Sequence, residues 1–172
     1  LKILFHRMIN NKQIQHKILS TDGLESVLQK WKQEQEIIVF TNGCFDILHL
    51  GHIDYLSKAA DLGTKLIVGL NSDDSVKAQN KSVSRPIQDE QSRSKILASL
   101  FFVDAVIIFN EATPYELIKI VQPDILVKGA DYKPEQIVGY DIVTANGGKV
   151  ITIDFLEGYS TTGIEKKIID AH

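Results

Sequence analysis

The stretch IIVFTNGCFDILHLGH, residues 37–52, joins a strand-like apolar run to the start of a helix. Residues 37–40 are apolar without alternation, as expected of a strand that helices cover on both faces of a sheet. That strand ends near Thr41, so the residues after it lie at a carboxyl end of the predicted sheet. Open parallel sheets bind their ligands at this end.

Four further apolar runs, rich in Ile and Val, follow along the chain. They are KLIVGL (65–70), DAVIIF (104–109), DILVK (124–128) and KVITID (149–154). Helical patterns lie between and after them: one stops at Gly63, a second has Thr113 as its N-cap, and a third begins with Thr162 in a capping box. Five strands joined by helical crossovers predict an α/β fold with a Rossmann-like, doubly wound, five-stranded parallel sheet.

Residues 1–35 form an N-terminal helical arm in this interpretation, and residues 36–172 form the main domain. Asp22 and Glu25 have the spacing of a capping box. An apolar stripe with helical spacing accompanies them, made of Leu24, Val27, Leu28 and Trp31. We expect the arm to pack on the main domain, since the stripe would otherwise be exposed to water.

The composition excludes several classes of function. With 19 basic and 22 acidic residues the net charge is −3, which argues against a general nucleic-acid binder. Cys44 is the single cysteine, so an intrachain disulfide is excluded. No apolar run approaches the roughly 20 residues that cross a bilayer, and the first residues lack the apolar centre of a signal peptide. We therefore expect a cytoplasmic protein with no membrane partner.

Two histidines, His49 and His52, lie about one helical turn apart where the helix after the first strand begins. Gly43 and Gly51 let the backbone come close to a ligand or to a neighbouring element. A helix N-terminus attracts anions, and two imidazoles there can donate hydrogen bonds to phosphate oxygens whose charge grows during phosphoryl transfer. Two other interpretations stay open: a structural pair that caps the helix, and a metal pair, for which Asp46 is the obvious further ligand nearby.

Three later segments follow the second, fourth and fifth strands and carry residues suited to a nucleotide. GLNSDDSVKAQNKSVSRP (69–86) has three spaced basic residues with Lys81 in the middle. It is either a solvated loop or a mobile segment that neutralises a leaving pyrophosphate. LVKGADYKPEQIVG (126–139) is either a polar turn or a surface for a base, ribose or sugar. EGYSTTGI (157–164) supplies N-cap hydroxyls and a second helix end that attracts anions.

The order strand–glycine–HxGH–helix resembles the first signature of the HxGH nucleotidyltransferase superfamily, and the later segments resemble its other signatures over residues 36–169. In that superfamily both histidines contact the triphosphate of a nucleotide, and a substrate phosphate attacks the α-phosphate in line while pyrophosphate leaves. No covalent enzyme intermediate forms, and Mg²⁺ travels with the nucleotide. The resemblance implies catalytic roles for His49, His52 and Lys81. Arg93 aligns with a family arginine; its residue type and place are more typical of a packing or helix-surface residue, and a contact with phosphate is the second interpretation.

The same resemblance implies two sets of binding residues. For the nucleotide they are Thr41, Asn42, Gly43, Cys44, Phe45, Gly51, Lys128, Gly129, Asp131, Ser160, Thr161 and Thr162. For the second substrate they are Asp46 and Asn71. It assigns no residue to a resident metal.

Within the superfamily the chain is most similar to the adenylyltransferase domain of bacterial ADP-heptose synthase, through GLNSDDSV, TPYELI, PDILVKGADYKPE, ANGGKV and STTGI. That resemblance implies transfer of AMP from ATP to D-glycero-β-D-manno-heptose 1-phosphate for lipopolysaccharide core synthesis. The superfamily likeness also implies a homodimer. Many members carry a ribokinase-type sugar kinase, which 172 residues are too few to include, so we expect it as a fused domain or a partner.

Two alternatives lead to different functions. A cytidylyltransferase acting on glycerol 3-phosphate or a phosphoamine shares GxFDxLHxGH, but it usually has MGDDW where this chain has KGADY, and an arginine where Phe155 stands. Neither difference selects ATP over CTP on physical grounds. A nucleotide-binding regulator without catalysis is the other class, and the presence of His49, His52 and the STT motif argues against it.

Overall fold

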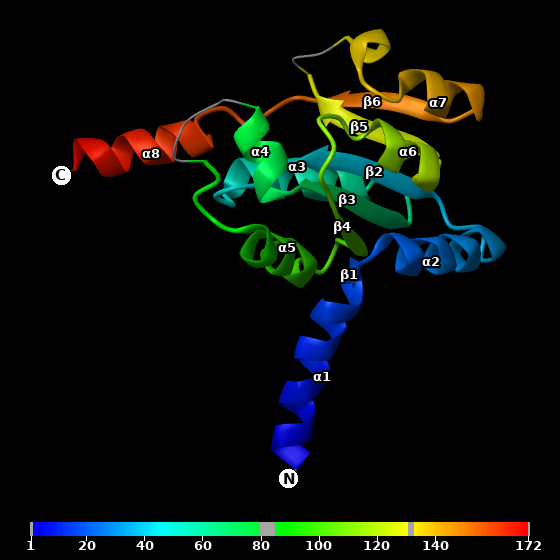
Figure 1. Ribbon diagram of the computed structural model, residues 1–172, viewed down its shortest axis with the longest axis horizontal. Coiled ribbons are helices and arrows are strands. Elements are labelled where there is room, and N and C mark those ends of the chain that lie inside the picture. The colour runs from blue at the N-terminus through cyan, green and yellow to red at the C-terminus, as the bar shows by residue number, and fades with distance from the viewer. Residues whose placement is uncertain (1, 80–84, 131–132, 172) are drawn as a thin grey trace.

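The computed structural model describes residues 2–79, 85–130 and 133–171. Its centre is a six-stranded sheet in which every neighbouring pair is parallel (Figure 1). The strands are β1 (Ile18–Leu19), β2 (Ile38–Gly43), β3 (Lys65–Asn71), β4 (Ala105–Phe109), β5 (Ile125–Gly129) and β6 (Lys149–Ile153). Because all strands run the same way, their carboxyl ends meet at one edge of the sheet. The doubly wound α/β fold predicted from the sequence is confirmed.

The sixth strand corrects the expected count of five. β1 contains only Ile18 and Leu19, and it pairs with β4 so that Ile18 lies opposite Val106. Two residues are too few to produce a periodic pattern, so the sequence carries no signal for this strand. Because β1 lies within residues 1–35, that segment contributes to the sheet as well as supplying helices.

Helices connect the strands. They are α1 (Lys2–Lys17), α2 (Thr21–Gln33), α3 (Leu50–Ala60), α4 (Asp73–Ala78), α5 (Glu90–Ser99), α6 (Tyr115–Val121), α7 (Tyr140–Ala145) and α8 (Thr161–Asp170), with a short 3₁₀ turn at Pro134–Gln136. In the described part of the chain, no helix is both long and apolar enough to cross a membrane. Figure 1 shows α1 and α8 extending away from the sheet in different directions.

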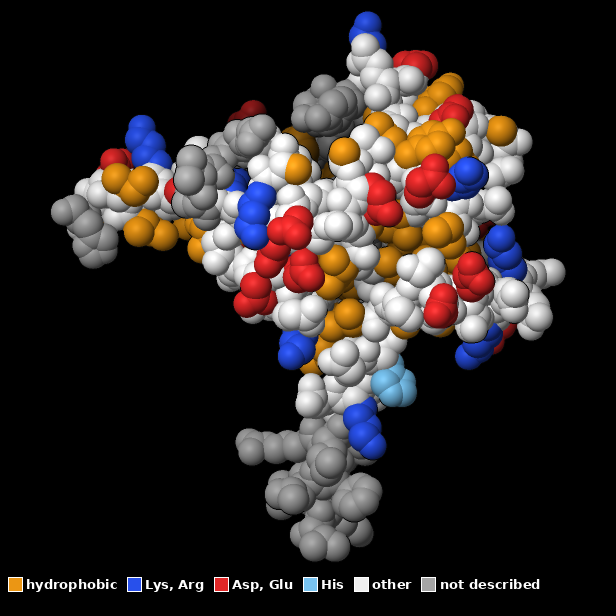
Figure 2. Space-filling view, viewed as in Figure 1, with side chains coloured by type: hydrophobic (Ala, Val, Ile, Leu, Met, Phe, Trp, Pro, Cys, Tyr) orange, Lys and Arg blue, Asp and Glu red, His pale blue; other side chains and the backbone are white. Residues whose placement is uncertain are grey.

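Apolar residues fill both faces of the sheet. One cluster joins Trp31 of α2 to Ile118 of α6 and Val143 of α7, and the other joins Leu56 of α3 to Leu97 of α5. The stripe Leu24, Leu28 and Trp31 is buried, which confirms that this part of the arm packs on the main domain. On the face shown in Figure 2, both acidic and basic side chains are present.

Two helix starts differ from the predicted ones. The N-cap of α2 is Ser20, and Asp22 lies within the first turn. The N-cap of α8 is Ser160, which confirms that one of the three predicted hydroxyl residues caps this helix, whereas Thr162 of the expected capping box lies within it. Neighbouring hydroxyl and carboxyl residues are all competent caps, and the residue that adopts the extended cap conformation is the one used.

Two further boundaries are corrected. Pro114 occupies the cap position of α6 without a side-chain hydrogen bond, so Thr113 is not the cap. α3 ends before Gly63, with Asp61 as its C-cap. Gly63 has a packing role instead, since a Cβ there would lie 2.6 Å from the carbonyl oxygen of Ile37. Glycine therefore allows the turn after α3 to pass close to the chain entering β2.

The order β1-β4-β3-β2-β5-β6 places the point of reversal between β2 and β5. From β2 the chain adds β3 and β4 on one side, and it later adds β5 and β6 on the other. The loops after two such neighbouring strands run toward opposite sides of the sheet. A crevice therefore forms between these loops at the carboxyl edge. The residues after β2 and β5 therefore border the place where a ligand is expected.

Candidate active site

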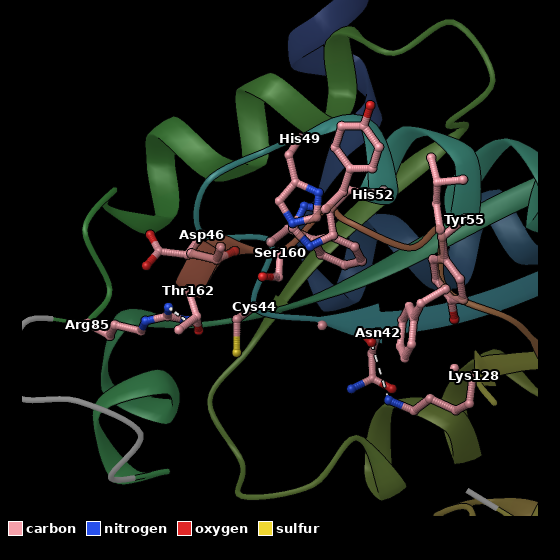
Figure 3. A pocket seen from close by; sticks show the side chains of 18 residues that line it. Asn42, Cys44, Asp46, His49, His52, Tyr55, Arg85, Lys128, Ser160 and Thr162 are labelled. Carbon is pink, nitrogen blue, oxygen red and sulfur yellow. Dashed lines mark hydrogen bonds between the residues drawn. The ribbon is translucent and has the colours of Figure 1, made fainter. Parts of the chain in front are cut away.

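A cavity of about 550 Å³ lies at this edge, between the ends of β2 and β5 and the starts of α3 and α8 (Figure 3). The predicted residues from the β2–α3 segment that line it are Asn42, Gly43, Cys44, Phe45, Asp46, His49, Gly51 and His52. Those from the end of β5 and the start of α8 are Lys128, Gly129, Ser160, Thr161 and Thr162. Three sequence signatures that are far apart in the chain thus meet at one cavity.

The two histidines form a stacked pair. Their ring centroids are 3.8 Å apart and the ring planes differ by 18°. His49 occupies the N-cap position of α3 but its side chain makes no capping hydrogen bond. In both rings Nδ1 is buried and has no hydrogen-bond partner in the described part of the chain. The absence of a capping hydrogen bond from His49 argues against the interpretation of a structural pair that caps the helix.

Burial keeps both rings neutral near pH 7. The pKa of His52 is lowered from 6.5 to about 4, first by burial and then by the neighbouring His49. Burial also lowers the pKa of His49. A neutral imidazole carries one N–H donor and one acceptor nitrogen. In the tautomer with the proton on Nε2, each ring can donate one hydrogen bond to an anion, and an approaching polyphosphate would raise both pKa values.

The start of α8 lies beside the histidines. Ser160 Oγ accepts a hydrogen bond from the N–H of Gly163 at 3.0 Å, which leaves the other N–H groups of the first turn without intrahelical partners. Gly51 makes the close approach possible, since a Cβ there would lie 3.1 Å from the His49 ring and 3.2 Å from Cβ of Tyr159. The predicted anion-attracting helix end is therefore part of the same cavity as the imidazoles.

Asp46 lies in the cavity wall with its carboxylate already engaged. It accepts hydrogen bonds from the backbone N–H groups of Ile87 and Gln88, each at 2.9 Å. Two predicted residues do not line the cavity. Thr41 is buried behind it, with Oγ1 2.8 Å from the hydroxyl of Tyr55, and Asn71 is buried with its amide donating to Ser75 Oγ.

At the β5 end of the cavity, Lys128 Nζ donates to the backbone carbonyl of Asn42 at 3.3 Å. Lys81 and Asp131 lie outside the described residues, so their predicted roles stay predictions. Among the residues that the structure describes, no group of three or more His, Cys, Asp and Glu side chains is placed to hold a metal ion.

Five lining residues were not assigned to the site from the sequence. They are Tyr55, Arg85, Phe155, Leu156 and Tyr159. Tyr55 follows His52 by nearly one helical turn, so helical spacing could have identified it. Figure 3 separates the labelled residues into two ends, with Asp46, Arg85 and Thr162 at one end and Asn42, Tyr55 and Lys128 at the other.

Arg93 supports the site from behind. Its side chain is fully buried, so the helix-surface interpretation is wrong and the packing interpretation is confirmed. The guanidinium donates to the carbonyls of Cys44 at 2.6 Å and Asn71 at 2.8 Å, and to Asp73 Oδ1 at 2.7 Å. It therefore ties the loop after β2 to the end of β3 and does not line the cavity.

The chain matches a family model described as Cytidylyltransferase-like over residues 40–167. The bifunctional protein HldE of Campylobacter concisus is 54% identical over 158 residues, which cover 91% of this chain and 32% of that protein. The bifunctional protein HldE of Syntrophotalea carbinolica is 49% identical over 156 residues, with the same shares. This chain thus spans about a third of the length of these curated relatives.

Two solved structures are also similar. The lipopolysaccharide core biosynthesis protein from Thermoplasma volcanium is 32% identical with a TM-score of 0.56, over 73% of this chain and 99% of that one. The pantoate-beta-alanine ligase of Francisella tularensis, complexed with beta-gamma ATP and beta-alanine, is 20% identical with a TM-score of 0.59, over 89% of this chain and 77% of that one. The latter supports the fold alone. Together with the HxGH cavity, these matches confirm the predicted superfamily: the chain belongs to the cytidylyltransferase-like family.

Proposed function

We propose that the chain is a nucleotidyltransferase that moves AMP from ATP to D-glycero-β-D-manno-heptose 1-phosphate, giving ADP-heptose and pyrophosphate. The observation that carries this proposal is the stacked His49–His52 pair beside the N-terminus of α8 in one cavity. The similarity to HldE proteins and to a lipopolysaccharide core biosynthesis protein supports the choice of substrates.

The reaction exchanges one P–O bond for another. An oxygen of the sugar phosphate bonds to the α-phosphorus of ATP, and the bond from that phosphorus to the bridging oxygen of the β-phosphate breaks. The bridging oxygen keeps the electron pair and leaves with pyrophosphate. Negative charge shifts among the α-phosphate and leaving oxygens, so donors held in place lower the barrier. His49, His52 and the first turn of α8 supply such donors, and no nucleophilic side chain is required.

Magnesium enters this proposal as part of the nucleotide substrate. Asp46 is the acidic side chain among the described lining residues, and its carboxylate accepts hydrogen bonds from two backbone N–H groups. It is therefore poorly disposed to act as the centre of a protein-built Mg²⁺ site, which normally adds carboxylates to phosphate oxygens. Mg²⁺ would neutralise phosphate charge while the chain orients the phosphates.

A panel of ATP, CTP, GTP and UTP against heptose 1-phosphate and glycerol 3-phosphate tests the function. We expect pyrophosphate release with ATP and heptose 1-phosphate, dependent on Mg²⁺. Turnover with CTP and glycerol 3-phosphate instead would assign the chain to the cytidylyltransferase alternative. Tight nucleotide binding without turnover on any pair would indicate a regulator and would overturn the proposal.

We also propose a homodimer in the cytoplasm that works with a sugar kinase. The word bifunctional in the relatives' name and their greater length support a second activity outside the matched region. Light scattering on the purified chain tests the dimer, and a monomeric mass would contradict it. A longer HldE relative, but not this chain, should transfer the γ-phosphate of ATP to the 1-hydroxyl of a heptose, and failure of the relative to do so would contradict the kinase link.

A further inference from the structure

Arg85 lines the cavity at the end where Asp46 and Thr162 lie (Figure 3). Two residues further on, the chain is attached to the loop after β2, because Ile87 donates its N–H to the Asp46 carboxylate. The same carboxylate binds the next N–H, that of Gln88. These contacts fix the backbone next to Arg85 beside the loop after β2.

The guanidinium of Arg85 is bound by Glu165 of α8. Nε lies 3.1 Å from Oε1 and Nη2 lies 2.8 Å from Oε2, which is a bidentate ion pair. Nη2 also lies 3.4 Å from Thr162 Oγ1. In the described part of the chain, Nη1 makes no hydrogen bond. Glu165 is not among the residues that line the cavity, whereas Arg85 and Thr162 are.

An acidic side chain beside an anion site weakens anion binding unless its charge is neutralised. The Arg85 and Glu165 side chains are only 16% and 24% exposed, so water screens the pair incompletely. The planar guanidinium fork fits a phosphate as well as a carboxylate. A polyphosphate that carries several charges can therefore compete with Glu165 for Arg85.

We propose that Arg85 is a phosphate-binding residue that is held by Glu165 in the free protein and binds the terminal phosphates of the nucleotide. This inference rests on the proposed function and adds a residue to that site. The aromatic ring of Tyr55 and the amino group of Lys128 lie at the opposite end of the cavity (Figure 3). A nucleoside bound there would extend its phosphates past the histidines toward Arg85 and the start of α8.

Two substitutions break the same ion pair and separate this role from a structural one. Arg85→Ala removes the side chain proposed to bind phosphate. Glu165→Gln keeps that side chain and removes only the carboxylate charge paired with it. We expect Arg85→Ala to raise the dissociation constants of ATP and inorganic pyrophosphate about tenfold to a hundredfold, as for a lost charge-assisted hydrogen bond. Titration calorimetry measures both constants. Glu165→Gln should bind both probes as tightly as the wild type or a few times more tightly. Arg85→Lys, which keeps the charge but not the fork, should lie between wild type and Arg85→Ala.

Melting temperatures of the variants provide the control, because loss of one partly exposed ion pair should lower them about equally in Arg85→Ala and Glu165→Gln. If both variants lose affinity alike, or if Arg85→Ala binds pyrophosphate within twofold of the wild type, Arg85 is a tether and the inference is wrong. If the wild type binds neither ATP nor pyrophosphate, the proposed function fails as well. Wild-type binding together with parallel loss in both variants overturns the Arg85 role alone.

Discussion

The stacked histidines predict an unusual dependence of stability on pH. The pKa of His52 is about 4 in the folded protein, against 6.5 for an unperturbed histidine. Between these values the unfolded chain binds a proton that the folded chain does not, so the free energy of unfolding falls as the pH falls. This contribution is fully present above about pH 6.5 and is lost progressively toward pH 4.

The two pKa values bound the size of the effect. Their separation corresponds to at most about 3–4 kcal/mol, at about 1.4 kcal/mol for each pH unit. Solvent reaches part of the His52 ring, which the structure places among partly buried residues. Screening by that solvent reduces the expected loss to about 1–2 kcal/mol between pH 7 and pH 4.5.

Urea unfolding at several pH values measures this loss through the fluorescence of Trp31, the single tryptophan, which is buried on α2. His52→Asn keeps a polar side chain but cannot titrate. From pH 7 to pH 4.5 its free energy of unfolding should therefore fall by about 1–2 kcal/mol less than that of the wild type. His16→Asn, at an exposed position on α1, serves as the matched control and should follow the wild type. If His52→Asn and the wild type lose stability in parallel from pH 7 to 4.5, the explanation from a desolvated imidazole is wrong.

Three further predictions concern turnover, nucleotide recognition and stability. His49→Ala should lower the turnover number about a hundredfold or more while the melting temperature changes little, because it removes a donor to the developing charge; an unchanged rate would exclude the pair from catalysis. Phe155 is 59% exposed in the cavity, with its ring centroid 6.1 Å from that of Tyr55. Phe155→Ala should raise the dissociation constant of ATP at least fivefold but leave that of pyrophosphate unchanged, since base stacking contributes about 1–3 kcal/mol. Equal effects on both probes would contradict a base contact. Arg93→Met should lower the free energy of unfolding by about 3–5 kcal/mol in urea, because it leaves buried oxygens and a carboxylate without their partner; a loss below about 1 kcal/mol would show that Arg93 does not hold the two loops together.

Local patterns account for the parts of the structure that the sequence predicted. The apolar runs predicted for β2–β6 begin within one residue of the observed strands because a strand between two helical layers needs uninterrupted apolar side chains. The HxGH segment and the STT segment could be placed at a carboxyl edge because the strand before each of them was recognisable. The resemblance to the superfamily then assigned thirteen residues that line the cavity.

Other features depend on chain segments that meet only in three dimensions. β1 is recognised only by its pairing with β4. The Asp46 carboxylate accepts hydrogen bonds from backbone N–H groups about forty residues further along the chain. The Arg85–Glu165 pair spans 80 residues of sequence. Thr41 and Asn71 were predicted to bind the substrates, yet their side chains are buried and do not line the cavity.

The sequence by itself determined strands β2–β6, their parallel arrangement and the chemical character of the cavity, because these follow from local periodicity, turn residues and short motifs. Only the tertiary structure decided which side chains face the cavity, which carboxylates already accept hydrogen bonds and which cation pairs with Glu165. Those properties depend on where crossover helices and loops bring distant residues together, and a side chain's type does not specify its partner across the fold.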